Sequence, residues 1–210
     1  MNLNLDREIN MAVTRLFYKS VYKSDDTYTM TSELAQLLEK HRKEVYDNVS
    51  NVTSKDTYVL NDPLCNELKA WLHSHLASFF YDYYKIDKKV KMFITQSWLN
   101  FTEKGEFHHT HNHPNSILSG VFYFTGEDIQ LKFHSDTDLF KGLQLPVTQY
   151  TDDNSEGYDI KVSPGQLVLF PSHMTHEVPE FKGTLRVSLA FNTFIKGDIG
   201  SLAGLTRVEI

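Results

Sequence analysis

The chain has 210 residues and a formal net charge of −6, from 21 lysines and arginines against 27 aspartates and glutamates. With 40% hydrophobic and 13% aromatic residues it can bury a full core, which excludes a disordered chain and a disulfide-stabilised scaffold. The acidic balance and the lack of a dense lysine and arginine block give no electrostatic footprint for nucleic acid or an anionic membrane, so neither partner is expected.

The amino-terminal segment does not have the pattern of a secretion signal. Residues 1–17 read MNLNLDREINMAVTRLF, in which charges interrupt the apolar run that a signal peptide needs. The longest apolar stretches, near 117–124 and 167–170, are shorter than the roughly 20 residues that cross a bilayer. We therefore expect a cytoplasmic protein and no membrane partner.

The period of hydrophobicity changes once along the chain. It predicts a single domain, 1–210, with a helical and extended region over 1–88 and a β core over 89–210. An extended stretch over 15–22 comes first. The fold class expected from this order is mainly β, with amino-terminal helices packed on a sheet.

Two helices are predicted in the first region. Thr31 and the residue after it can cap a helix that has Leu34, Leu37, Leu38 and Val45 at helical spacing and ends near Asn48. The polar run DNVSNVTSKDT that follows predicts a loop. The second helix starts at Asp62 and Pro63, with proline in the first turn, and its broad apolar face predicts that it covers a sheet.

Six strands are predicted in the second region, separated by turns that contain glycine. They lie near 90–101, 116–125, 128–134, 158–163, 166–170 and 184–195. The polar stretch over 135–157 shows little periodicity and predicts a long loop. Such loops often carry binding elements, but the sequence does not say what this one does.

Histidine is unusually concentrated, because four of the ten lie within 108–113. In an extended backbone His111 and His113 point to the same face, which gives two nitrogen ligands on one edge. His176, 63 residues after the second of these, can supply a third ligand. A close pair and a distant histidine form the pattern of a mononuclear non-haem iron site, although each histidine alone is as compatible with an ordinary polar surface.

Arg186 and Ser188 follow ten and twelve residues after His176. If the chain turns back through 180–183 as a hairpin, Arg186 lies on the adjacent strand and faces the same cavity. A guanidinium there can clamp a carboxylate, with the serine hydroxyl as a second donor. The alternative for Arg186 is a surface ion pair on a strand.

Two longer segments resemble a known family. WLNFTEKGEFHHTHNHPNSILSGVFYF and SPGQLVLFPSHMTHEVPEFKGTLRVSLAFN are similar to the 2-oxoglutarate and Fe(II)-dependent oxygenases, in particular to a branch with H-x-HP-NS-x-LSGV-x-Y and FPS-x-x-x-H motifs. The resemblance covers about half of the chain, near 91–193. It implies a double-stranded β-helix, or jelly roll, with iron near its mouth.

The resemblance also implies roles for individual residues. His111, His113 and His176 match the three iron ligands, and no catalytic residue is implied beyond them. Arg186 and Ser188 match the residues that bind the far carboxylate of 2-oxoglutarate, and Tyr123 and Asn100 match further positions that line the same pocket. Most of the superfamily has Asp or Glu where His113 stands, so that a water or a loop acid such as Asp136 is the alternative ligand.

These matches predict an Fe(II)- and 2-oxoglutarate-dependent dioxygenase. Its small-molecule partners would be 2-oxoglutarate and dioxygen, and its unidentified substrate would be a small molecule or a peptide side chain, possible examples being prolyl or other amino-acid residues. Two alternatives stay open. One is a cupin-type enzyme with three histidines that does not use 2-oxoglutarate, and the other is a non-catalytic jelly-roll protein that binds metal or ligand. The sequence does not indicate the oligomeric state.

Overall fold

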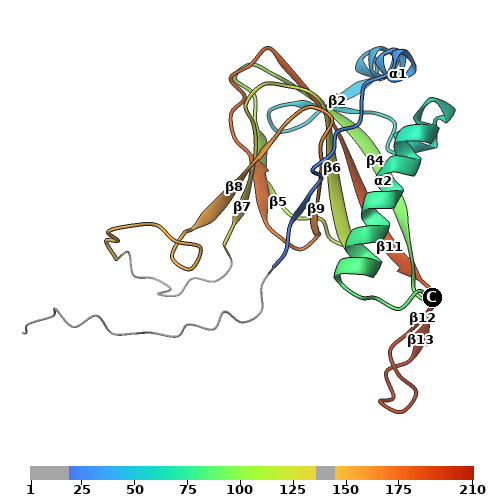
Figure 1. The fold of residues 1–210 in the computed structure, drawn as a ribbon. Helices are drawn as coiled ribbons and strands as arrows, with labels where there is room; N and C mark the ends of the chain where they lie inside the picture. The colour runs from blue at the N-terminus through green and yellow to red at the C-terminus, as the bar shows by residue number, and fades with distance from the viewer. Residues whose placement is uncertain (1–18, 136–144) are drawn as a thin grey trace, which may run out of the picture.

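Two antiparallel sheets face each other in the computed structural model, which describes residues 19–135 and 145–210 (Figure 1). The large sheet has the strand order β1-β9-β6-β11-β4-β3-β2, and the small sheet has the order β5-β10-β7-β8. Neighbours in these orders are mostly distant in the sequence, as in a jelly roll. The predicted fold class, a mainly β double-stranded β-helix, is confirmed.

The predicted strands are found with small differences at their ends. The large sheet consists of β1 (Tyr22–Lys23), β2 (Val45–Asp47), β3 (Val52–Ser54), β4 (Lys91–Glu103), β6 (Leu118–Thr125), β9 (Leu167–Pro171) and β11 (Leu185–Lys196). The small sheet consists of β5 (His108–His111), β7 (Ile129–His134), β8 (Gly157–Val162) and β10 (His176–Val178). A hairpin of β12 (Asp198–Ile199) and β13 (Val208–Glu209) projects from the body at the carboxyl end (Figure 1).

The first helix is shorter than predicted. Helix α1 (Ser32–Arg42) begins where expected, because the Thr31 hydroxyl accepts a hydrogen bond from the Leu34 amide. It does not continue to Asn48, since Val45 is the first residue of β2 and pairs with Ser54 of β3. The predicted loop over 47–57 was therefore wrong in part: a turn closed by a hydrogen bond from the Asn48 amide to the Asn51 carbonyl joins two short strands.

The predicted second helix consists of three consecutive segments. They are a 3-10 turn, η2 (Pro63–Cys65), helix α2 (Asn66–Ala77) and a π-helical segment, η3 (Ser78–Tyr83). Another 3-10 turn, η1 (Val59–Asn61), precedes them. The Asp62 carboxylate caps the start by accepting from the Leu64 amide, and proline occupies the first turn as predicted. No helix within 19–135 or 145–210 is both long and apolar enough to cross a membrane.

Two hydrophobic cores hold these layers together. In the larger one, the apolar face of α2, with Leu68, Leu72 and Leu76, packs on the large sheet at residues such as Leu99 and Phe122. Helix α2 therefore covers the outer face of that sheet, as the sequence predicted (Figure 1). The smaller core lies between the sheets and is formed by Tyr123, Ile129, Leu131, Phe133, Val162, Val168, Phe170 and Met174.

The loop predicted over 135–157 is described only in part. Residues 145–156 form exposed turns between β7 and β8, while 136–144, and with them the candidate ligand Asp136, lie outside the described residues. The extended stretch predicted over 15–22 is described from residue 19 on, and its last residue, Tyr22, begins β1.

Candidate metal centre

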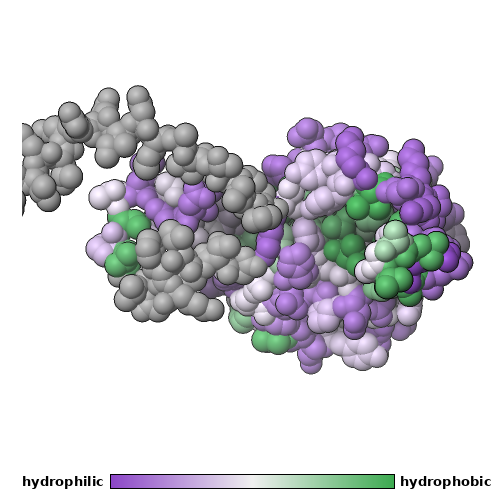
Figure 2. Space-filling model, turned by 90° about the horizontal axis from the view of Figure 1, so that it is seen from below, coloured by the Kyte–Doolittle hydropathy of each residue, from purple (hydrophilic) through white to green (hydrophobic). Residues whose placement is uncertain are grey.

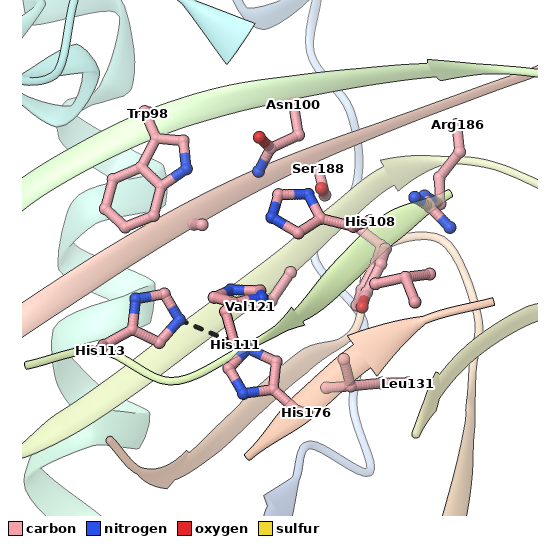
Figure 3. Close-up of a pocket in the computed structure, with 13 residues that line it drawn as sticks. Trp98, Asn100, His108, His111, His113, Val121, Leu131, His176, Arg186 and Ser188 are labelled. Atoms are coloured by element: carbon pink, nitrogen blue, oxygen red, sulfur yellow. Dashed lines mark hydrogen bonds between the residues drawn. The ribbon is translucent and has the colours of Figure 1, made fainter. Parts of the chain in front are cut away.

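Sheet pairing brings two of the predicted ligands together. His111 ends β5 and His176 begins β10, and the two residues are direct partners in the antiparallel register, with ring centroids 4.3 Å apart. His113 lies just beyond the strand, where its amide donates to the Ser172 carbonyl. Its ring centroid is 5.0 Å from that of His111 and 5.1 Å from that of His176. One ligand atom from each of the three lies within 4.8 Å of the others (Figure 3).

Backbone carbonyls orient two of these rings. The Nδ1 atom of His111 lies 2.7 Å from the His109 carbonyl, and that of His176 lies 2.9 Å from the Met174 carbonyl. A carbonyl only accepts, so Nδ1 carries the proton and Nε2 keeps its lone pair. The Nε2 atoms of His113 and His176 are 3.3 Å apart. Two nitrogens each about 2.1 Å from one ion and at right angles would be about 3 Å apart, so this spacing fits a single metal ion.

Burial keeps the imidazoles in the form that binds metal. It lowers the pKa of His176 to about 3 and the pKa of His113 to about 4, and it lowers the pKa of His111 as well. A neutral imidazole is the ligand form, so these residues are ready to bind a cation at neutral pH. The cluster contains no carboxylate from the part of the chain that the structure describes.

An arginine without a counter-ion lies at the other end of the same pocket. Arg186 is only 3% exposed, its Nη2 donates to the Thr102 hydroxyl at 2.9 Å, and its guanidinium lies 5.5 Å from the centre of the Phe181 ring. Burial lowers the pKa of Arg186. No carboxylate within 19–135 or 145–210 forms an ion pair with it. Because an unpaired buried charge is costly, this site fits an organic anion.

Three further polar groups line the pocket between the arginine and the histidines. The Tyr123 hydroxyl is buried and has no hydrogen-bond partner among the described residues, and burial raises its pKa to about 12. Asn100 uses its Oδ1 to accept from the Thr53 hydroxyl, which leaves its amide group as a donor. Ser188 pairs with Asn100 across β11 and β4 and lines the same space. Neutral donors beside a guanidinium are suited to a carboxylate.

All seven residues singled out in the sequence line or form this one pocket. The predicted position of Arg186 in the sheet was wrong, however. The arginine is not on a strand adjacent to His176: it lies on β11, between β4 and β6 in the large sheet, whereas His176 belongs to the small sheet. The two residues therefore face each other across the sandwich, as Figure 3 shows.

Sequence reasoning undervalued several lining residues. His108 was not singled out in the sequence, but it lines the pocket with Ser188, its ring lies beside that of His111, and burial lowers its pKa to about 3. Trp98 was not singled out either, but it lines the end of the pocket next to His113. Its two-residue spacing from Asn100 on one strand was the available signal. The apolar wall is formed by Val121, Leu131, Val178 and Ala190.

The fold and this arrangement define a jelly-roll protein with a candidate mononuclear metal centre and an anion site facing it. Residues 96–192 match the model of a family described as putative 2OG-Fe(II) oxygenase. This segment contains most of the β core, and over it the chain is similar to the 2-oxoglutarate and Fe(II)-dependent oxygenases. None of the curated proteins matches the chain.

Solved structures show the same fold at low identity. An oxidoreductase of the 2OG-Fe(II) oxygenase family from Burkholderia pseudomallei has a TM-score of 0.57 at 14% identity, covering 82% of this chain and 83% of that one. A Pseudomonas putida prolyl-4-hydroxylase has a TM-score of 0.53 at 15% identity, covering 83% and 92%. HygX from Streptomyces hygroscopicus, solved with nickel, 2-oxoglutarate and hygromycin B, has a TM-score of 0.55 at 10% identity, covering 83% and 82%.

Proposed function

We propose that this protein is an Fe(II)- and 2-oxoglutarate-dependent dioxygenase that hydroxylates a small molecule or an amino-acid side chain, acting in the cytoplasm. The observation that carries the proposal is the pairing of two sites in one pocket. Three neutral imidazoles suited to one divalent cation face a buried guanidinium that has no counter-ion among the described residues. A 2-oxo diacid is a ligand that can reach both.

Each group of the pocket has a separate task. His111, His113 and His176 would hold the iron through nitrogens whose lone pairs are available at neutral pH. Arg186 would bind the far carboxylate of 2-oxoglutarate, with the hydroxyls of Tyr123 and Ser188 as further donors. Asn100 would donate its amide to the same cosubstrate.

Apolar side chains surround these groups. When bound, iron and 2-oxoglutarate supply an oxygen-dependent decarboxylation to succinate and carbon dioxide, coupled to hydroxylation of a substrate C–H bond. Val121, Leu131 and Ala190 line the pocket with apolar surface. They exclude water from the reacting groups and strengthen the electrostatic contacts of Arg186.

The all-histidine ligand set favours one second candidate. Three neutral ligands leave more positive charge on a metal ion than two histidines and a carboxylate do, which is compatible with a cupin-type enzyme that does not use 2-oxoglutarate. The unpaired Arg186 separates the two candidates, because only the first needs a carboxylate-binding cation opposite the metal.

The test is release of succinate from 2-oxoglutarate by purified protein, with iron and oxygen each added or omitted. We expect release that requires both, and its loss in His176→Ala together with loss of bound metal in elemental analysis. His173→Ala, three residues earlier and outside the pocket lining, is the matched control. Binding of metal without any consumption or binding of 2-oxoglutarate would favour the cupin-type candidate.

A further inference from the structure

The pocket-facing side of the large sheet continues far beyond the pocket. Strands β4 and β11 have 13 and 12 residues, whereas β5 and β10 of the facing sheet have only four and three. Trp98 and Ala190, which are partners in the register, line the last part of the pocket. Gln96 and Asn192, the next partners on the same face, lie outside it.

Beyond that pair the same face presents two phenyl rings. Thr95 has no partner on β11, and this bulge brings Phe93 opposite Phe194. Their strand neighbours Ile94 and Ile195 pack into the core on the helix side, so the two phenyl rings face the side of the metal centre. They are 36% and 37% exposed, so two neighbouring phenyl rings are accessible to solvent on this face of the sheet.

We call this surface the open shelf and define it as Trp98, Gln96, Asn192, Phe93 and Phe194. It begins at His113, whose ring centroid is 5.9 Å from that of Trp98. Figure 3 shows Trp98 and Arg186 at opposite ends of the pocket, so the shelf leads away from the anion site. In Figure 2, apolar surface gathers around a hollow on the side of the molecule that has the carboxyl-terminal hairpin in Figure 1.

The outer end of the open shelf is basic. Lys91 and Lys196 are the next partners on the same face after the two phenylalanines, and the Lys196 ammonium lies 5.9 Å from the centre of the Phe93 ring. Neither forms an ion pair with the described residues. The segment KIDKKVK over 85–91 adds Lys88 and Lys89, and the backbone of Lys89 packs against Gly197. A cationic end is thus built into a chain whose net charge is −6.

The order of groups along the shelf fits an extended acidic peptide. Trp98 lies seven positions after Lys91, a distance of roughly 20 Å in a strand, which is far longer than a free amino acid. The exposed Gln96 amide can bond a peptide backbone, phenyl rings can pack on apolar side chains, and lysines attract carboxylates. The lack of a dense lysine and arginine block argues against nucleic acid, because its binding needs many neutralised phosphates.

We propose that the open shelf binds the substrate of this oxygenase, and that this substrate is a peptide segment whose acidic end lies against Lys91 and Lys196. The residue to be oxidised would then lie beside Trp98, at the end of the shelf next to the histidines. This inference rests on the proposed function, since it assigns a substrate class to the same site.

The test uses the full-length protein loaded with nickel and 2-oxoglutarate and an array of random peptides of about twelve residues, a length that spans the shelf. We expect capture of peptides that combine an apolar segment with aspartate or glutamate at one end. The double variant Lys91→Glu/Lys196→Glu should lower capture about tenfold and shift the preference to basic peptides. Phe93→Ser/Phe194→Ser should lower capture of all peptides.

The matched control is Lys43→Glu/Lys104→Glu, which makes the same charge change at exposed lysines, one of them just past the other end of β4. It should bind the same peptides as the wild type. Capture without charge preference, capture that the Lys91→Glu/Lys196→Glu protein retains, or tighter binding of a mixed-sequence single-stranded oligonucleotide at physiological salt would overturn the proposal. In each case retained binding of metal and 2-oxoglutarate would show that the proposed function itself stands.

Discussion

Thr110 donates a hydrogen bond to the Glu177 carboxylate across β5 and β10, on the face of the small sheet opposite the paired ligands His111 and His176. Each partner is the strand neighbour of one ligand, so the contact joins the two ligand strands from the outside. Lys132 and His134 of β7 lie 3.7 Å and 3.3 Å from the same carboxylate. The distance between the two imidazoles is therefore fixed by a side-chain contact as well as by the backbone.

Removing this contact should weaken metal binding without unfolding the protein. Thr110→Val keeps the shape and the β-branching of the side chain but deletes the hydroxyl, and we expect the nickel affinity to fall about tenfold, as for other groups that orient metal ligands. Titration calorimetry measures the affinity. Thr206→Val, in the carboxyl-terminal hairpin, is the control. An unchanged affinity in Thr110→Val would show that the backbone pairing alone sets the ligand distance.

His113 can be tested by two substitutions at one position. His113→Ala should lower the affinity for Fe(II) at least about 100-fold, because it leaves only two protein ligands. His113→Asp supplies the carboxylate that the superfamily usually has there and should retain binding within about tenfold of the wild type. Anaerobic titration with Fe(II) measures both. Wild-type affinity in the alanine variant would mean that another group is the third ligand.

Arg186 is predicted to serve binding at a cost in stability. Arg186→Met removes a buried cation that has no counter-ion among the described residues, so the free protein should unfold at an equal or higher temperature. The same variant should lose about 100-fold or more in affinity for 2-oxoglutarate while it keeps its metal affinity. Thermal unfolding and fluorescence titration give the two quantities. Arg42→Met, at a surface pair with Glu103, is the control. A large loss of stability would indicate a structural role.

Substitution of Tyr123 should have a similar but smaller effect on the affinity for 2-oxoglutarate. Tyr123→Phe deletes a buried hydroxyl that has no partner within the described parts of the chain, so the stability of the free protein should not decrease. If the hydroxyl donates to the cosubstrate, the affinity for 2-oxoglutarate should fall about tenfold, which corresponds to one hydrogen bond to a charged group. Equal 2-oxoglutarate affinities in the two proteins would remove Tyr123 from the anion site.

The Asp62 carboxyl should make the stability of the folded protein depend on pH. A hydrogen bond from Lys40, and then one from the Leu64 amide, lowers the pKa of the Asp62 carboxyl. A lowered pKa in the folded state stabilises the protein above the ordinary pKa, and this contribution is lost as the pH falls through the folded value. Asp62→Ala should cost about 1 kcal/mol at neutral pH through loss of the helix cap.

Asp62→Asn separates the charge from the cap, since its amide oxygen still accepts from the Leu64 amide. Its stability difference from the wild type should be constant from about pH 7 to about pH 5 and should shrink as the pH falls below about 4, the ordinary pKa of the carboxyl, because the unfolded chain binds its proton there before the folded protein does. Urea unfolding across this pH range measures this difference. A gap that stays constant with pH would contradict the assignment of the lowered pKa to the folded state.

The amino-acid sequence was sufficient to predict the strongly periodic elements and to predict that His111, His113 and His176 lie close together. The alternating pattern predicts the six longer strands, and the proline after Asp62 predicts the start of the second helix, because such signals are local. The spacing of His111 and His113, and the family-like motif around His176, predict which residues meet. Short strands such as β2, β3, β5 and β10 were missed, since three or four residues carry too little periodicity and their pairing partners are distant.

Only the tertiary structure decided how these residues face one another. The sequence placed Arg186 on a strand next to His176, but the jelly-roll topology puts them on opposite sheets, and this separation creates the pocket between a cation site and an anion site. The open shelf also could not be predicted from the sequence, because it depends on the different lengths of facing strands and on the bulge at Thr95. Strand pairing between distant segments is a global property, and no local pattern of residues encodes it.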